Sequence, residues 1–254
     1  MHGLLIVAAN TLRESLRDKI LYNLVFFALI LIGASVLIGA LTIAEQDKII
    51  KDMGLAAINL TSVAIAIFVG VGLVTKEIER RTIYTILARP ITRAQFVFGK
   101  YIGLSLTILI NVGIMVAIFV ATLWLSNSAI HGSLFQAIQL LLIEALLVTA
   151  IAMFFSTFTS PTLGATMTIG LYVIGHLTAD LKALAEKNQN EITKAVMTVL
   201  YYLCPNLEML NIKGQAAHGV LVSASYQMLA TTYGLFYAGV LLLGAFLIFE
   251  RRDF

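Results

Sequence analysis

The sequence predicts an all-α, polytopic membrane protein with six transmembrane helices. Of its 254 residues, 59% are apolar and only 12% are charged, whereas roughly 25% charged residues is usual in a soluble domain. The apolar residues gather in six long segments, each close to the ~20 residues that a helix needs to cross a bilayer. The single cysteine, Cys204, excludes an intrachain disulfide framework. We expect one transmembrane domain over residues 1–254.

Residues 1–19 differ from the six long segments because charged side chains are interleaved with apolar ones. Arg13, Glu14 and Arg17 stand among leucines, valine and alanine. This pattern suits a helix that lies in the membrane interface rather than crossing it. Thr11 and Glu14 also have the spacing of a capping box, which predicts a helix start at Thr11.

Six apolar segments follow, and each predicts a membrane-spanning helix. The first is too long for a signal-peptide core and precedes five others, so we expect it to be retained. The three prolines, Pro90, Pro161 and Pro205, fall between these segments. The broken helices of many secondary carriers are therefore not indicated. The predicted spans cover approximately residues 20–44, 54–75, 99–125, 135–158, 162–180 and 226–249.

The distribution of basic residues predicts the orientation. With a cytoplasmic N-terminus, the inside segments (1–19, 76–98, 159–161 and 250–254) and Lys100 hold eleven Lys and Arg residues. The outside segments hold six. The net charge is then +5 inside and −1 outside, with one further acid inside a span. By the positive-inside rule, both termini are cytoplasmic.

The segment between the second and third spans, residues 76–98, is rich in charge and has a helical pattern. Ile83 and Leu87 are one helical turn apart, which predicts a short amphipathic helix that ends before Pro90. Thr92 and Gln95 then predict a capped start for the third span. The segment is either a solvated basic loop or a docking surface with apolar anchors and orienting charges. The candidate docking residues are Glu77, Glu79, Arg80, Arg81, Ile83, Tyr84, Leu87 and Arg89.

Glu144 is the one acidic residue in the interior of a predicted span, about midway along it. An ionisable group at this depth costs roughly 2.5 to 3.5 kcal/mol on insertion scales, so it is a candidate functional residue. The alternative is a hydrogen-bonded packing contact between helices. A proton relay needs more buried titratable groups, and His176 is the available one. We expect no metal site, because the isolated histidines and Cys204 form no ligand pair.

The run from Glu79 to Thr82, followed by Leu87, Pro90, Arg93 and Gly99-Lys100, resembles the signature of ABC-2 type transporter permeases. Arg81 replaces the glycine that is usual there. The order of the remaining segments agrees with the same family. The run Ser156–Pro161 and the external Cys204–Leu207 also resemble the branch associated with maturation of copper enzymes such as nitrous oxide reductase.

The resemblance implies that residues 76–98 contain a coupling helix that docks on a separate ATPase. No phosphate-binding P-loop is present, because Ala94 stands where its first glycine belongs and Tyr101 follows Lys100. ATP and Mg²⁺ would therefore bind to the partner, with no cofactor in this chain. The family arrangement implies two ATPase copies and a second permease chain, as a homodimer in the lipids of a bacterial-type inner membrane, with no nucleic acid.

The region between the fifth and sixth spans, residues 181–225, is external in this orientation. The resemblance places a pair of short helices there as a lid over the exit path, whereas a packed cap would explain the same pattern. The lid candidates are Tyr201, Tyr202, Pro205 and Asn206.

The function that the sequence predicts is the membrane subunit of an ATP-driven exporter. One alternative is an ATPase-independent secondary carrier or channel. Another is a membrane assembly factor for a metalloenzyme, although clustered His, Cys or carboxylate residues at catalytic spacing are missing from the sequence.

Overall fold

A computed structural model describes residues 2–42, 45–79, 92–187 and 190–251. All regular structure in these ranges is helical, as predicted. Five of the described helices are long and apolar enough to cross a membrane. They are α2 (Lys19–Ala40), α3 (Gln46–Glu79), α5 (Arg93–Leu125), α6 (Gly132–Ser156) and α11 (Ala224–Arg251). The chain is a multi-pass, all-α membrane protein.

Helix α6 is the centre of the bundle. It packs against α3, α5, α7 (Pro161–His176) and α11, and most of its side chains are buried. The contact with α11 uses small residues, because Ala230, Gly234 and Ala238 are buried at four-residue intervals. A Cβ atom at Gly234 would lie 2.5 Å from the side chain of Ile143, so this approach requires glycine. The outward faces of the helices carry exposed apolar side chains, as expected beside lipid.

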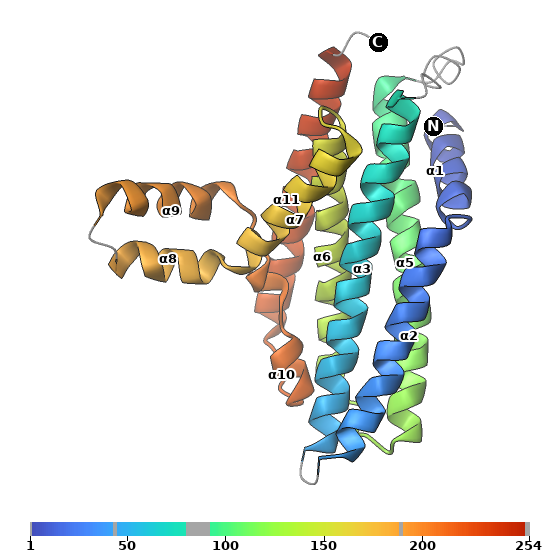
Figure 1. The fold of residues 1–254 in the computed structure, drawn as a ribbon, viewed down its shortest axis with the longest axis vertical. Coiled ribbons are helices and arrows are strands. Elements are labelled where there is room, and N and C mark those ends of the chain that lie inside the picture. The colour runs from blue at the N-terminus through green and yellow to red at the C-terminus, as the bar shows by residue number, and fades with distance from the viewer. Residues whose placement is uncertain (1, 43–44, 80–91, 188–189, 252–254) are drawn as a thin grey trace.

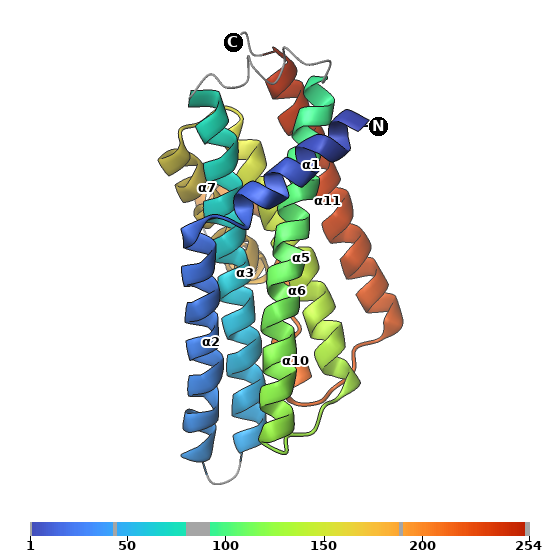
Figure 2. The ribbon, with the colours of Figure 1, turned by 90° about the vertical axis from the view of Figure 1, so that its right-hand side faces the viewer.

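The predicted count of six spans is not confirmed, because the fifth predicted span, residues 162–180, is divided. Helix α7 ends at His176 and a separate helix begins at Thr178. Sixteen residues extend only about 24 Å, which is shorter than the ~30 Å hydrocarbon core. The start of α1 (His2–Ser15) and the end of α11 nevertheless lie at the same end of the bundle (Figures 1 and 2).

Helix α1 lies obliquely across the bundle and packs mainly against α5 (Figure 2). Two glycines of α5 permit this approach. A Cβ atom at Gly99 would lie 2.8 Å from Cβ of Val7, and one at Gly103 would lie 2.6 Å from the carbonyl oxygen of Ala8. Thr11 is fully buried in the middle of α1. The predicted capping box at Thr11 is therefore wrong, because apolar packing on α5 continues the helix through that position.

Between α7 and α11, the described residues form four short helices. Two of them, α8 (Thr178–Lys187) and α9 (Glu191–Leu203), pack against each other and project sideways from the bundle (Figure 1). We call this pair the arm. The chain then returns to the bundle through η1 (Glu208–Leu210) and α10 (Lys213–Ala217).

Candidate functional site

The segment predicted to dock a partner joins the two longest helices of the bundle. Glu77 and Glu79 lie in the last turn of α3, and α5 begins at Arg93. The other candidate residues lie outside the described part of the chain: Arg80, Arg81, Ile83, Tyr84, Leu87 and Arg89. The predicted capping box is confirmed, because the Thr92 hydroxyl accepts from the Gln95 N–H and the Gln95 side chain accepts from the Thr92 N–H.

Arg93 connects the start of α5 to the end of α11. Its guanidinium donates to the carbonyl oxygens of Phe249 and Glu250, at 3.1 and 2.7 Å. These carbonyls belong to the last turn of α11, where a cation is favoured by the helix dipole. The rings of Phe96 and Phe249 stack beside this contact with centroids 5.4 Å apart. The end of α11 is thereby attached to the helix that follows the predicted docking segment.

A second polar contact holds α1 at this end of the bundle. The Lys100 side chain of α5 is 2% exposed, and its ammonium lies 3.8 Å from the carboxylate of Glu14. The same ammonium lies 5.9 Å from the centroid of the Phe96 ring. The ion pair and the ring compensate for burial of this charge.

Glu144 belongs to a cluster of three titratable side chains that joins three parts of the chain. His176, the last residue of α7, places Nε2 2.9 Å from Oε1 of Glu144 on α6. Its other ring nitrogen, Nδ1, lies 3.2 Å from Oε2 of Glu208 in η1. The Glu144 side chain is 1% exposed, whereas that of Glu208 is 44% exposed. The cluster therefore runs from the protein surface into the bundle.

The buried end of this cluster continues to α3. Tyr172, one turn before His176, packs edge-on against the imidazole with centroids 4.7 Å apart. Glu144 and Asn59 both lie near its hydroxyl. Asn59 is 2% exposed, and its Oδ1 atom has no hydrogen-bond partner among the described residues.

The segment that carries Glu208 is attached to α11 by three tyrosines. The Tyr226 hydroxyl donates to the carbonyl oxygen of Met209, and that of Tyr237 donates to the carbonyl oxygen of Leu203. The hydroxyl of Tyr233 accepts from the N–H of Asn206. Residues 226, 233 and 237 recur at helical spacing, so they share one face of α11.

The same segment also packs against the end of α7. The N–H of Leu207 donates to the carbonyl oxygen of Gly175, and the Thr178 hydroxyl donates to Oδ1 of Asn206. A Cβ atom at Gly175 would lie 2.8 Å from both Leu207 and the Pro205 carbonyl oxygen. The lid candidates Pro205 and Asn206 thus lie where α7, α11 and the returning chain meet.

The other two lid candidates, Tyr201 and Tyr202, lie on the arm. The ring of Tyr201 lies 5.6 Å from the Lys182 ammonium of α8, and this contact joins the two arm helices. Tyr202 is 80% exposed. Exposed apolar side chains recur at helical spacing along α9, at Ile192, Val196, Val199 and Leu203.

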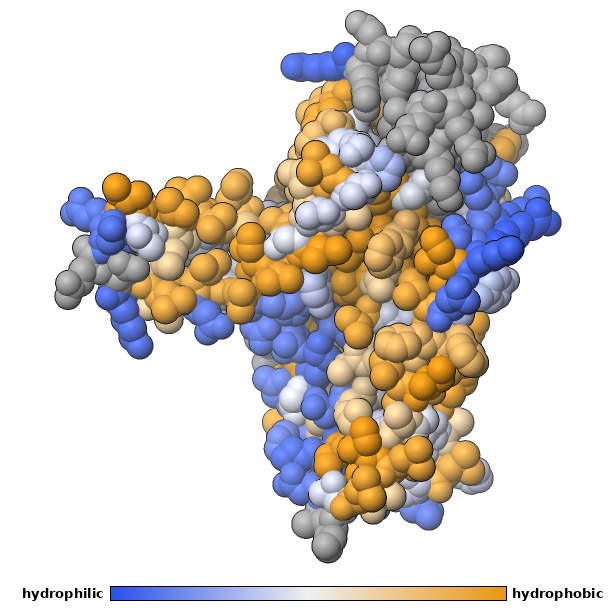
Figure 3. All heavy atoms as spheres, in the orientation of Figure 1, coloured by the Kyte–Doolittle hydropathy of each residue, from blue (hydrophilic) through white to orange (hydrophobic). Residues whose placement is uncertain are grey.

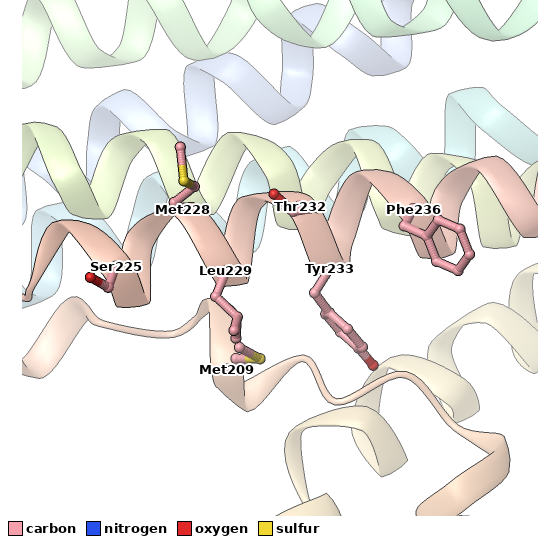
Figure 4. Close-up of a pocket in the computed structure, with 7 residues that line it drawn as sticks. All are labelled: Met209, Ser225, Met228, Leu229, Thr232, Tyr233 and Phe236. Atoms are coloured by element: carbon pink, nitrogen blue, oxygen red, sulfur yellow. The ribbon is translucent and has the colours of Figure 1, made fainter.

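An apolar groove of about 650 Å³ lies between α11 and η1 (Figure 4). Leu229 and Tyr233 project from α11 toward the segment that carries Met209. The hydroxyls of Ser225, Thr232 and Tyr233 are its polar groups. Such a groove suits an acyl chain or another apolar group. Its lining is Met209, Ser225, Met228, Leu229, Thr232, Tyr233 and Phe236.

Among the described residues, no group of three or more His, Cys, Asp and Glu side chains is arranged to hold a metal ion. Cys204 is buried at the end of α9, and burial raises the pKa of its thiol. A raised pKa lowers the thiolate fraction and therefore the reactivity of this cysteine.

A comparison with protein families identifies the family of the chain. Residues 5–254 match the family described as ABC-2 family transporter protein. The chain therefore belongs to the ABC-2 transporter family, and it is a membrane-spanning permease component of an ABC transporter. A comparison with proteins of curated function found no match. The resemblance to the copper-enzyme branch stays a prediction.

Sequence reasoning identified Glu144 and His176 but not their connection to Glu208, Tyr172 and Asn59. In the sequence, Glu208 contributes only to the net charge of the external segments. It follows Pro205-Asn206 in an irregular segment without periodicity, and it meets His176 across 32 residues of chain. The buried amide of Asn59 in an otherwise apolar stretch of α3 was a local signal that could have indicated a polar contact.

Proposed function

We propose that this chain is the permease of an ATP-driven exporter whose ATPase is a separate subunit. Family membership supports a transporter component, and the sequence has no P-loop of its own. ATP and Mg²⁺ would bind to the partner ATPase, which docks on residues 76–98. Two permease chains and two ATPases would make the complete transporter in the inner membrane, with both termini in the cytoplasm.

The observation that carries this proposal is that two long, continuous helices precede and follow residues 80–91 in the chain. Helix α3 has 34 residues and α5 has 33, so each is about 50 Å long. Both run from the end where the predicted docking segment joins them to the far end of the bundle (Figure 1). A displacement of the docking segment by an ATPase would therefore move rigid elements that cross the whole bundle.

Helix α11 provides a second route for this motion. Arg93 attaches its end to the start of α5, and its three tyrosines attach its other half to residues 203–209. A movement at the ATPase side would thus shift the segment next to α7. Such coupling requires that the ATPase binds the two conformations with different affinities.

A second permease chain would cover the apolar face of the arm. Ile192, Val196, Val199 and Leu203 are exposed at helical spacing along α9. The arm extends from the bundle at a steep angle to the spanning helices (Figure 1). In a twofold dimer, the arm of each chain would make the same contact with the other chain.

The test is purification of the affinity-tagged chain from its native membrane in a mild detergent. The proposal expects a P-loop ATPase to copurify at a one-to-one ratio by quantitative mass spectrometry, together with Mg²⁺-dependent ATP hydrolysis. Transport activity in proteoliposomes that contain only this chain, without an ATPase, would instead support a secondary carrier or channel.

A further inference from the structure

We propose that Glu208, His176 and Glu144 form a proton relay that delivers protons from the external surface to a buried binding site at Glu144. The relay would make the state of the permease depend on the external proton concentration. It rests on the proposed orientation, in which residues 181–225 are external, and not on which cargo the transporter carries.

The hydrogen bonds of the cluster require a definite number of protons. Both ring nitrogens of His176 face a carboxylate oxygen, at 2.9 Å from Glu144 and 3.2 Å from Glu208. Neutral imidazole donates from one nitrogen only, and a carboxylate only accepts. Both hydrogen bonds form only if the imidazole is protonated or one carboxyl group is. The cluster therefore holds one proton more than a neutral histidine with two carboxylates.

The three side chains of the cluster differ in their exposure to solvent. The exposed fraction falls from 44% at Glu208 to 19% at His176 and 1% at Glu144. Figure 3 shows a hydrophilic surface below the arm, alongside α10, where Lys213, Gln215 and His218 are at least partly exposed. Asn211 of this region donates to both carboxylate oxygens of Glu208. The outer end of the cluster therefore lies in a polar, hydrated surface rather than beside lipid.

The buried end of the cluster extends toward α3. Glu144 and Asn59 both lie near the Tyr172 hydroxyl, and Oδ1 of Asn59 has no hydrogen-bond partner among the described residues. A buried amide oxygen without a donor is costly, and an ordered water molecule is a common solution. A water molecule there would extend the hydrogen-bonded chain from Glu144 toward α3.

The loading step moves one proton inward. Water protonates Glu208, and Glu208 passes that proton to Nδ1 of neutral His176 while Nε2 releases its own proton to Oε1 of Glu144. Glu208 is again a carboxylate, His176 is again neutral with its proton on Nδ1, and Glu144 is a neutral acid. One proton has left the water and one negative charge has left the bundle interior.

The charged and titratable groups around His176 come from each element packed against it. Glu144 faces it from α6, Glu208 from η1 and Tyr172 from its own helix. Lys213 of α10 acts on it at longer range. Burial opposes a positive charge on the imidazole, but the two carboxylates at hydrogen-bond distance favour proton uptake. Glu144, 1% exposed, is the innermost carboxyl group of the cluster and is therefore the end point of the proposed relay.

The experiment uses the purified full chain in lipid nanodiscs, with the proton itself as the ligand. After a downward pH jump, a proton-sensitive dye in the bulk measures uptake, and infrared difference spectra detect the carbonyl band of a protonated carboxylic acid. Wild-type protein should develop this band, and Glu144→Gln should lack it. His176→Gln should slow appearance of the band by about a hundredfold, the usual contribution of a positioned proton-transfer group.

Matched controls separate the relay from general effects on folding. His218→Gln and Glu191→Gln alter exposed residues outside the cluster and should behave as wild type. Glu208→Gln changes a partly exposed side chain, so it tests the relay even if His176→Gln does not fold, and it should also slow uptake. A band that persists in Glu144→Gln, or equal uptake rates in Glu208→Gln and wild type, would overturn the proposal.

Discussion

The Nε2 atom of His176 lies 2.9 Å from Oε1 of Glu144, and this contact joins α7 to the central helix α6. Two sequence hypotheses for Glu144 were a packing contact and a functional carboxylate. The hydrogen bond is compatible with both, because a charged pair and a neutral pair have the same heavy-atom positions. The two hypotheses differ in what happens when the charge is removed and the shape is kept.

Glu144→Gln should leave the abundance of the protein normal but slow the transport cycle. Glutamine can still accept a hydrogen bond from His176, so only the charge-assisted part, about 1.4 kcal/mol, is lost. A loss of that size in one step slows it about tenfold. The measurement is ATP hydrolysis by the permease–ATPase complex in nanodiscs, with Glu191→Gln as control. Normal turnover in Glu144→Gln would favour the packing role.

Gly103→Ala should destabilise the contact between α1 and α5, whereas Gly113→Ala on the same helix should not. The new Cβ atom at position 103 would lie 2.6 Å from the Ala8 carbonyl oxygen, but nothing lies within 4 Å at position 113. Overpacking costs about 1–3 kcal/mol, while alanine in an open helical position gains up to about 1 kcal/mol. In thermal unfolding in detergent, Gly103→Ala should have a lower melting temperature than wild type, and Gly113→Ala should have a higher one. Equal melting temperatures would show that α1 is not held as described.

Cysteine labelling with a membrane-impermeant reagent tests the orientation. Asn190→Cys and Lys213→Cys should react from outside the cell, whereas Thr85→Cys should react only after the membrane is opened. The native Cys204 should contribute little background labelling, because it is buried and the pKa of its thiol is raised. The reverse pattern would overturn the predicted cytoplasmic location of both termini.

Val196→Asp should dissociate the permease dimer if a second chain covers the arm. Val196 is 53% exposed in the single chain, so a charge there loses about 1 kcal/mol of burial on each chain and adds an unpaired carboxylate. Val196→Thr, which keeps the shape, should retain the dimer. Light scattering after size exclusion gives the mass, and an unchanged dimer in Val196→Asp would indicate that lipid covers this face instead.

The sequence predicted those parts of the fold that depend on local pattern. Long apolar segments became the five helices able to cross a membrane, and the capping box at Thr92 formed. The box at Thr11 has the same spacing but is wrong, because the residues before it are themselves apolar and pack on α5. Spacing alone therefore does not determine where a helix starts when tertiary packing continues it.

Other features depend on contacts between distant residues and had no local signal. The fifth predicted span is divided after His176. At this point Leu207 packs against Gly175, and the Thr178 hydroxyl donates to Asn206. These contacts join residues about thirty positions apart, so hydropathy could not locate the break. The same folding back of residues 204–210 brings Glu208 to His176, which explains why the cluster was only partly predicted.

The central claim is that a separate ATPase docks on residues 76–98 and drives this permease. The most direct measurement is copurification of the ATPase with the Ile83→Asp/Leu87→Asp variant, beside the conservative Ile83→Val/Leu87→Met variant. Two charges on the predicted apolar face of the docking segment should remove most of the ATPase while the membrane level of the permease stays normal, and the conservative variant should retain it. Undiminished ATPase with Ile83→Asp/Leu87→Asp would contradict the account.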